Sequence, residues 1–308
     1  MNVPHRVCTS FLYAMLIAGC TREPGSTQLT KGALRVDCDE AVAPVVRLLV
    51  EEFQQQYPDA KVTVNPVEAR EATANFVNDS VRVIVVARPL NTEERSVLTT
   101  TKTWFEEYHV AQGAVAVVVN RANPVKSLRV GQADSIFAGL VTTWPGWRAG
   151  GPIDVVVGGY NSSTNEVFRE AILGSRKYAI SATPFSSSNE LLDHVRQARG
   201  AIGLLGVSWL KGVENDVSVL GLARPGVSPD SSQSPGKPYT PIQGYVYKGY
   251  YPVSTPVYIY TRSVDRDVAL GFISFASSGQ GQKVFLNNGL VPVKSPVRLI
   301  QLTSEQVK

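Results

Sequence analysis

The stretch that decides the fold runs from residue 34 to residue 57 and reads LRVDCDEAVAPVVRLLVEEFQQQY. Residues 34–37 alternate between apolar and polar side chains, which predicts a short strand. Residues 42–57 carry apolar side chains at helical spacing, at Val45, Val46, Leu48, Leu49 and Phe53. The stretch therefore predicts a strand followed by a helix, the repeating unit of an α/β protein.

The same unit recurs on both sides of the middle of the chain. Downstream of the first unit we expect strands at 61–65 and 81–87, a helix at 68–78, and a further helix that begins at Thr92 behind the cap Asn91. Such alternation predicts a mostly parallel sheet with helices on both faces and ligand sites at the carboxyl ends of its strands. The remaining expected strands are 107–111, 114–119, 153–157, 202–205, 245–260 and 290–293, and the remaining expected helices are 133–137, 165–173, 190–199 and 264–277.

Length and composition fit a globular chain with two cores. The 308 residues exceed what one core usually supports, and the 44% hydrophobic and 18% charged content excludes a wholly disordered chain. Beyond the first twenty residues no apolar run is long enough to span a bilayer, and no basic run interleaved with aromatics indicates nucleic acid. Pro225 to Pro241, rich in Ser, Pro and Gly, predicts a long surface loop.

The N-terminal residues have the layout of an export signal. Arg6 precedes an apolar stretch, and residues 17–20 read IAGC, which resembles the bacterial lipobox. We therefore expect a signal peptide at 1–19, a lipid on Cys20 and a flexible tether over 20–32; a cleaved signal with an incidental cysteine is the alternative. Cys38 is then left without a disulfide partner and is expected to be a small buried residue.

Three further segments carry a family resemblance. Residues 120–144 contain NRANPVKSL and SIFAGLVTTW, residues 200–210 read GAIGLLGVSWL, and residues 272–293 read FISFASSGQGQKVFLNNGLVPV. Together they make the chain similar to the phosphate-binding subunit of the ABC-type phosphate importer, within the type II periplasmic-binding-protein superfamily. The resemblance covers nearly all of the chain after the tether.

This resemblance implies a two-lobed α/β fold and a transport function. Each lobe is expected to hold a mixed, mostly parallel sheet flanked by helices, with two crossing segments between the lobes. Lobe one would comprise residues 33–118 and 244–308, and lobe two residues 119–243. The implied protein is a monomeric lipoprotein of the periplasm or cell surface that captures inorganic phosphate or a similar oxyanion for an ABC permease, without metal or cofactor. A sensor or adhesion lipoprotein of the same fold remains the alternative.

Four strand-to-helix junctions are candidates for holding the oxyanion. A dehydrated anion needs many directed donors, and helix N-termini supply free backbone N–H groups together with a positive dipole end. Ser162-Ser163-Thr164 resembles the family's Ser-Gly-Thr loop, although an ordinary helix cap would look alike. The expected ligand-binding residues are Asp39, Glu40, Ala41, Arg70, Arg88, Asn161, Ser162, Ser163 and Thr164.

Three departures from the family argue against strict phosphate specificity. Arg88 stands where the family commonly has an aspartate, while Gly158 and Gly159 occupy the region of a family arginine. A guanidinium binds an oxyanion through two parallel hydrogen bonds, so Arg88 is the foremost candidate for direct contact. Asp39 and Glu40 replace the usual Ser and Thr; they would repel an anion unless they cap the helix or one accepts the ligand's proton.

An enzyme has little support in the sequence. General acid–base or nucleophilic chemistry needs a base beside a nucleophile, and the histidines after the signal are His109 and His194. No nucleophile elbow, phosphate-binding Walker loop or paired metal-ligand motif occurs. Packing or surface roles are expected for both histidines.

Overall fold

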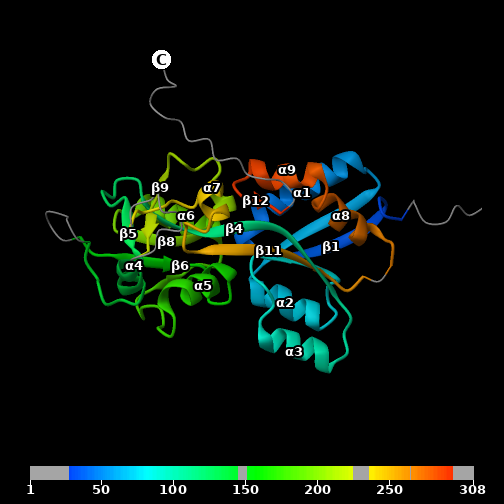
Figure 1. The fold of residues 1–308 in the computed structure, drawn as a ribbon, viewed down its shortest axis with the longest axis horizontal. Coiled ribbons are helices and arrows are strands. Elements are labelled where there is room, and N and C mark those ends of the chain that lie inside the picture. The colour runs from blue at the N-terminus through cyan, green and yellow to red at the C-terminus, as the bar shows by residue number, and fades with distance from the viewer. Residues whose placement is uncertain (1–27, 145–150, 225–235, 264, 294–308) are drawn as a thin grey trace, which may run out of the picture.

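The computed structural model describes residues 28–144, 151–224, 236–263 and 265–293. The expected signal peptide, the lipid on Cys20 and most of the tether lie outside these residues. Figure 1 shows two α/β lobes side by side along the long axis, with strands crossing between them. We call the part built on β1–β3 the first lobe and the part built on β6–β8 the second lobe; the lobe boundaries given above stay predictions.

The first lobe is a parallel β-α-β unit with helices on both faces. Strand β1 pairs in parallel with β2 and β3, and β3 pairs antiparallel with β11. Helices α1, α8 and α9 lie on one face, and α2 and α3 lie on the other (Figure 1). These elements are β1 (Gly32–Asp39), α1 (Ala43–Gln56), β2 (Ala60–Val67), α2 (Ala69–Val77), β3 (Val83–Val86), α3 (Thr92–Thr100), β11 (Ser254–Thr261), α8 (Val268–Ala276) and α9 (Gly279–Asn287).

Local chemistry explains the first-lobe helices. The inward stripe of α1 includes Val45, Val46, Leu49 and Phe53, which are all fully buried. Asn91 caps α3 as predicted: its side chain accepts a hydrogen bond from Glu94 N, and the Glu94 carboxylate accepts one from Asn91 N. Cys38, near the end of β1, is buried and free, and burial raises the pKa of its thiol.

The second lobe repeats the plan with shorter elements. Strand β6 pairs in parallel with β8 and β7, and helix α5 continues directly into one turn of π-helix, η2. Its elements are β5 (Ser127–Arg129), α4 (Val130–Phe137), β6 (Asp154–Val157), α5 (Ser163–Phe168), η2 (Arg169–Leu173), β7 (Thr183–Pro184), α6 (Ser188–Gln197), β8 (Ala201–Gly206), β9 (Val217–Val219) and β10 (Gly221–Ala223).

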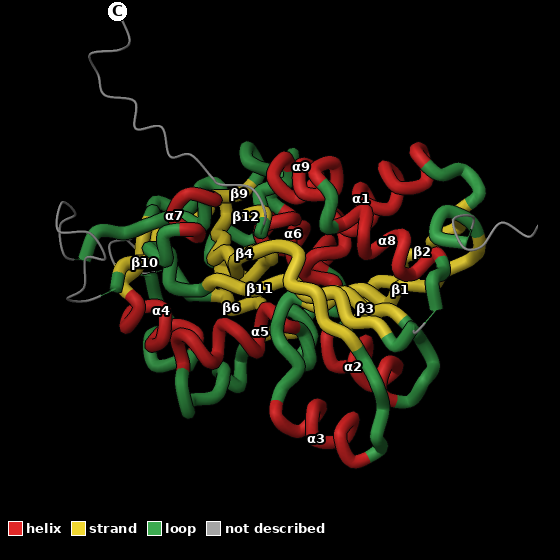
Figure 2. Tube along the Cα trace, turned by 45° about the vertical axis from the view of Figure 1, so that its right-hand side comes forward, coloured by secondary structure: helices red, strands yellow, loops and turns green. Residues whose placement is uncertain are grey.

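A single long strand, β4 (Glu106–Asn120), connects the two lobes. Its first half pairs antiparallel with β11 and with β12 (Val291–Pro292), and its second half pairs antiparallel with β8 and β9. The sheet order is therefore β2-β1-β3-β11-β4-β8-β6-β7, and Figure 2 shows these strands as one continuous band. Two separate strands were predicted here; pairing on both sides of Gly113 makes them one.

The prediction of one strand from 245 to 260 is wrong in its first half. Residues Gln243–Tyr247 form the short helix α7, and β11 begins only at Ser254. Gly249, with φ at 68°, and Pro252 interrupt the extended backbone between them. Tyr258 and Tyr260 lie on β11 with ring centroids 5.6 Å apart, within the half of the predicted strand that is correct.

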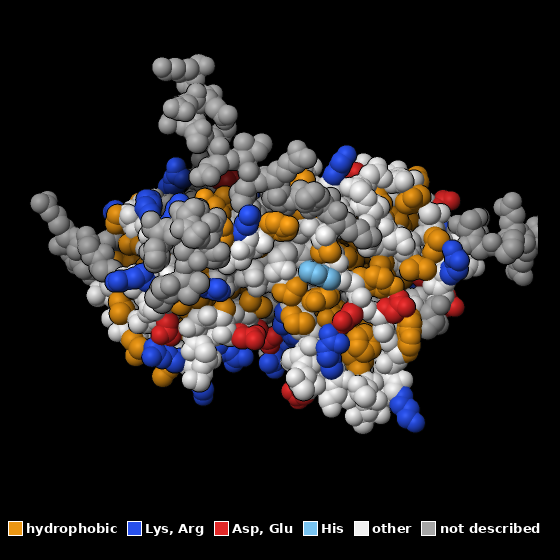
Figure 3. Space-filling model, viewed as in Figure 1, with side chains coloured by type: hydrophobic (Ala, Val, Ile, Leu, Met, Phe, Trp, Pro, Cys, Tyr) orange, Lys and Arg blue, Asp and Glu red, His pale blue; other side chains and the backbone are white. Residues whose placement is uncertain are grey.

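The surface carries charges of both signs. On the face in Figure 3, acidic and basic side chains both occur on both lobes. Within the described ranges, no helix is both long and apolar enough to cross a membrane.

Candidate functional site

Two helix starts face each other where the lobes meet. In the first lobe, β1 ends at Asp39 and passes through the short 3-10 helix η1 (Glu40–Val42) into α1. In the second lobe, a turn at residues 158–161 follows β6, and Ser162 caps α5 by accepting from Asn165 N at 3.3 Å. Both starts follow the carboxyl end of a parallel strand, the position expected for a ligand site.

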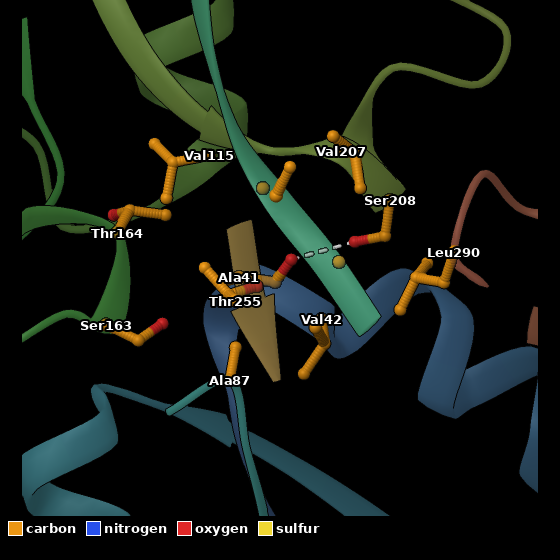
Figure 4. A pocket seen from close by; sticks show the side chains of 13 residues that line it. Ala41, Val42, Ala87, Val115, Ser163, Thr164, Val207, Ser208, Thr255 and Leu290 are labelled. Atoms are coloured by element: carbon orange, nitrogen blue, oxygen red, sulfur yellow. Dashed lines mark hydrogen bonds between the residues drawn. The ribbon is translucent and has the colours of Figure 1, made fainter. Parts of the chain in front are cut away.

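A small cavity lies between these two starts. Figure 4 shows Ala41 and Ala87 approaching from the first lobe and Ser163 and Thr164 from the second. Its volume is about 10 Å³, which is room for about one water molecule. The full lining is Ala41, Val42, Ala87, Gly113, Ala114, Val115, Ser163, Thr164, Gly206, Val207, Ser208, Thr255 and Leu290.

The side wall of the cavity also joins the lobes. Ser208, on the 3-10 helix η3 (Val207–Trp209), donates to Ala41 O at 2.8 Å (Figure 4). Gly206 packs against the same backbone, because a Cβ there would lie 2.2 Å from Ala41 O. The first helix start is therefore held against the second lobe by its own carbonyl oxygens.

Asp39 is fully buried behind the cavity. Its Oδ1 accepts from Ala41 N at 3.2 Å and its Oδ2 from Ala87 N at 3.0 Å. Burial raises the pKa of the Asp39 carboxyl, and the Ser163 hydroxyl and the two backbone donors partly oppose this rise. Ser163 Oγ is close enough to act on that pKa, but it forms no hydrogen bond of standard geometry. The carboxyl of Asp39 thus already uses two of the N–H groups that were expected to serve a ligand.

Glu40 faces away from the cavity and spans the two lobes. Its Oε1 accepts from Ser188 N, at the start of α6, at 3.0 Å, and its carbonyl oxygen accepts from Trp209 Nε1 at 2.8 Å. Burial raises the pKa of the Glu40 carboxyl, while the Ser188 hydrogen bond lowers it. Glu40 therefore acts as a contact between the first helix start and the second lobe.

Arg88 follows β3 and lies in a buried network of carboxylates. Its Nη1 and Nη2 donate to the two oxygens of Glu94 at 2.8 Å and 2.7 Å, and its Nε lies 2.5 Å from Glu166 Oε2. The Arg88 side chain is 5% exposed, and both glutamates are 13% exposed. Burial lowers the Arg88 pKa, but the hydrogen bonds and charges of Glu94 and Glu166 raise it overall, so the guanidinium is charged. Direct contact between Arg88 and an oxyanion stays a prediction.

Arg70 and Asn161 complete the contact across the cleft. Arg70 is half exposed and its Nε pairs with Glu166 Oε1, so Glu166 on α5 is held by two first-lobe arginines. The backbone N–H of Arg70 donates to Asn161 O at 3.2 Å. Among the predicted residues, the structure thus brings Ala41, Ser163 and Thr164 to the cavity, Asp39 behind it, and both arginines to the interlobe ion pairs.

A much larger groove adjoins the cavity. It has a volume of about 600 Å³, and Ala41 and Thr164 line both spaces. The groove is lined by Glu40, Ala41, Arg47, Pro66, Val67, Glu68, Glu71, Gly158, Gly159, Ser162, Thr164, Phe185, Ser186, Ser187, Ser188, Asn189, Leu191, Leu204 and Trp209.

The two carboxylates that hold Arg88, those of Glu94 and Glu166, were not predicted from the sequence. Glu94 had a local signal, because a Glu three residues after Asn91 completes a capping box. Glu166 had none: it lies 78 positions from Arg88, and only the fold brings the two together. Trp209 and Ser208 lay inside a segment quoted for its family likeness, but nothing local predicted their bonds to the first helix start.

Comparison with known proteins gives a consistent result. A profile of the PBP superfamily domain matches residues 24–280. Protein SphX of Synechococcus elongatus is 26% identical over 273 residues, which cover 85% of this chain and 78% of that protein. The phosphate-binding protein PstS of Staphylococcus epidermidis is 23% identical over 279 residues, covering 87% and 82% of the two chains.

Solved structures share the fold. A putative phosphate ABC transporter substrate-binding protein from Clostridium perfringens, solved with bound phosphate, superposes with a TM-score of 0.71 at 22% identity. The superposition covers 85% of this chain and 100% of the Clostridium perfringens chain. An ABC-type phosphate transport receptor from Vibrio cholerae superposes with a TM-score of 0.63 at 21% identity, over 85% and 100% of the two chains.

Proposed function

The chain belongs to the PBP superfamily, and from this premise we propose that it is an extracytoplasmic solute-binding protein that captures inorganic phosphate or a similar small oxyanion for an ABC-type importer. Its relatives and structural neighbours reported above are named as binding or transport proteins rather than as enzymes. Relatives and structural neighbours named for phosphate binding support this choice of ligand.

The observation that carries the proposal is the meeting of two helix starts at one cavity. An anion removed from water needs donors from several directions, and the first amides of α5 together with the Ser163 and Thr164 hydroxyls lie at the cavity. Ser163 Oγ is buried and lacks a hydrogen bond of standard geometry among the described residues, so it has a donor to offer. Such a site suits a compact oxyanion.

Asp39 and Arg88 are given complementary roles. The raised pKa of the Asp39 carboxyl makes it a suitable acceptor for a proton of the ligand. Arg88 supplies positive charge beside Asp39, and its Nε makes no hydrogen bond of standard geometry with the described residues. We propose that the guanidinium exchanges its contact with Glu166 for the oxyanion.

Binding requires the lobes to separate. A cavity with room for about one water is too small for a tetrahedral oxyanion, so the ion pairs of Glu166 with Arg70 and Arg88 have to open. The lobes then close around the ligand, with the crossing segments absorbing the rotation. Scattering with and without phosphate is expected to show a change in radius of gyration.

We place the protein outside the cytoplasm, anchored by lipid on Cys20, as a monomer that meets a permease. The lipobox-like IAGC at residues 17–20 supports the anchor. Several acyl chains on one cysteine would hold the protein firmly at the membrane. A Cys20→Ser variant is expected to leave the membrane fraction.

Calorimetric titration of the chain without its signal tests the ligand assignment. We expect saturable binding of phosphate, with sulfate and molybdate as competitors of related shape. Thr164→Val is expected to weaken phosphate binding about tenfold, since it removes one hydroxyl donor. Thr100→Val, at the exposed end of α3, is the matched control. No heat with any of the three oxyanions would refute the proposal.

A further inference from the structure

The groove beside the cavity is far larger than an oxyanion needs. At about 600 Å³ it lies within the usual size range of pockets for organic ligands. Because Ala41 and Thr164 line both the cavity and the groove, a group held in the cavity has the groove as its neighbour. The geometry leaves room for a substituent on the bound oxyanion.

The charges that line the groove are mainly negative. Three carboxylates, those of Glu40, Glu68 and Glu71, face one guanidinium, that of Arg47. Glu40 is committed to Ser188 N. The side chains of Glu68 and Glu71 make no hydrogen bond or ion pair with any residue that the structure describes. The groove thus offers two uncommitted carboxylates, which favour a cation and disfavour a bare anion.

The absence of a side chain at Gly159, in the second lobe, leaves space for the carboxylate of Glu68, which belongs to the first lobe. A Cβ placed on Gly159 would lie 1.4 Å from Glu68 Oε1, so no larger residue fits there without displacing the Glu68 side chain. Glu68 precedes α2 in the first lobe, and Gly159 follows β6 in the second. The negative charge is therefore positioned across the interlobe boundary, beside the turn that leads to Ser162.

The rest of the lining fits a small polar organic group. Ser186, Ser187 and Ser188 line the groove; the Ser186 hydroxyl donates to Glu190 and the Ser187 hydroxyl accepts from Glu190 N. Phe185 and Trp209 supply half-buried aromatic surfaces. An ammonium group gains from aromatic faces as well as from carboxylates. The indole N–H of Trp209 is fixed on Glu40 O, which holds the ring in place.

We propose that the ligand is a zwitterion: a phosphate or phosphonate group in the cavity that carries a short substituent ending in an amine, which lies in the groove against Glu68 and Glu71. This inference rests on the proposed function, because the anionic group uses the donors assigned there. In the cavity, the amides and hydroxyls at the start of α5 bind the anionic group of the ligand. In the groove, the carboxylates of Glu68 and Glu71 attract its ammonium group. Such a ligand satisfies both environments, whereas inorganic phosphate satisfies only the first.

The test compares three ligands by calorimetric titration: inorganic phosphate, phosphoethanolamine and propyl phosphate. Propyl phosphate has the size of phosphoethanolamine but a methyl group in place of the ammonium. We expect phosphoethanolamine to bind about tenfold more tightly than propyl phosphate and than inorganic phosphate, as partly exposed ion pairs can provide.

Glu68→Gln is the matching variant. We expect it to weaken phosphoethanolamine binding about fivefold and to strengthen inorganic phosphate binding, because it removes a repelling charge. Glu52→Gln, exposed on α1 and outside the groove, is the control and is expected to change neither affinity.

The outcomes separate this inference from the function on which it rests. Phosphate binding with equal or weaker phosphoethanolamine binding overturns the zwitterion and leaves the oxyanion function standing. Tight phosphoethanolamine binding that Glu68→Gln does not weaken overturns the placement of the amine. Failure of all three ligands overturns the zwitterion, and the proposed function itself is refuted only if sulfate and molybdate also fail to bind.

Discussion

The two helix starts at the cavity share a backbone plan but differ in what their donors do. At the first start, the chain's own Asp39 carboxyl accepts from Ala41 N and Ala87 N. At the second, no carboxylate fills that role: Ser162 caps the helix, and the Ser163 hydroxyl stays buried without a hydrogen bond of standard geometry among the described residues. A strand-to-helix junction therefore provides donors, but the neighbouring side chains decide whether a ligand can use them.

The largest expected effect follows from removing Arg88, which links the end of β3 to the second helix start. Arg88→Ala leaves Glu94 without its cation and Glu166 with Arg70 alone, which should lower the free energy of unfolding by about 3–5 kcal/mol. If Arg88 also grips the oxyanion, phosphate affinity should fall about a hundredfold, because two charge-assisted hydrogen bonds are lost. Thermal unfolding and calorimetric titration measure the two effects separately.

Arg88→Lys sharpens the same result. An ammonium keeps the charge without the two-pronged geometry, so both stability and affinity should recover only in part. A folded Arg88→Ala protein with wild-type affinity would remove Arg88 from the ligand and direct attention to Arg70.

The next effect separates Asp39 as a structural acceptor from Asp39 as a ligand group. Asp39→Ala leaves two buried N–H groups unpaired and should destabilise the fold by about 2–4 kcal/mol. Asp39→Asn keeps one acceptor oxygen and should lose clearly less, as measured by denaturant unfolding. Equal losses in the two variants would contradict the hydrogen-bonding role.

At the second start we expect almost no change in stability. Ser163→Ala removes a hydroxyl with no standard hydrogen bond, so the free energy of unfolding should change by less than about 1 kcal/mol while phosphate affinity falls about fivefold. Ser96→Ala, exposed on α3, should change neither quantity. A strongly destabilised Ser163→Ala would mean that its hydroxyl is a structural partner of Asp39.

The smallest expected effect is a pH dependence at the first start. Burial raises the pKa of Asp39 in the folded chain, so the folded state holds the proton more tightly than the unfolded state. Its contribution to stability is therefore greatest at low pH and is lost as pH rises from about 4, the unfolded value, through the folded value. Relative to Asp39→Asn, the wild type should gain stability as pH falls from about 7 to about 4; a constant difference would refute the raised pKa.

The parallel halves of the fold could be predicted because their signals are local. The stripe of α1 and the Asn91 cap lie within single elements. The cap occurs as predicted, and so does the stripe except at Leu48, which is 37% exposed. The antiparallel centre was harder, because pairing with strands distant in sequence joins the two halves of β4. The first half of the strand predicted at 245–260 failed for a different reason: these residues form α7, which packs Tyr245 against Tyr239 with ring centroids 4.9 Å apart.

The candidate site was predictable as a set of positions but not as a set of partners. Ser163 and Thr164 could be placed at a helix start from their residue types alone. The partner of Arg88 could not be predicted in this way, because Glu166 belongs to the other lobe and the strength of the ion pair depends on its burial. The sequence shows that Arg88 stands where the family has an acidic residue. Only the fold identifies Glu166 as the carboxylate that compensates for its charge.

The continuous strand β4 also constrains how the chain can acquire its structure. Its 15 residues serve as the common template for β11 and β12 on one lobe and for β8 and β9 on the other. Neither lobe has a complete sheet until this strand is in place, so we expect the two lobes to fold together rather than as independent units. One partner of β4, the strand β12, ends at Pro292, far from β4 in the sequence. Pairing between strands so distant in sequence slows folding. During synthesis, the exposed edge of β4 has to wait for the end of the chain, the interval in which an unpaired edge is most open to wrong partners.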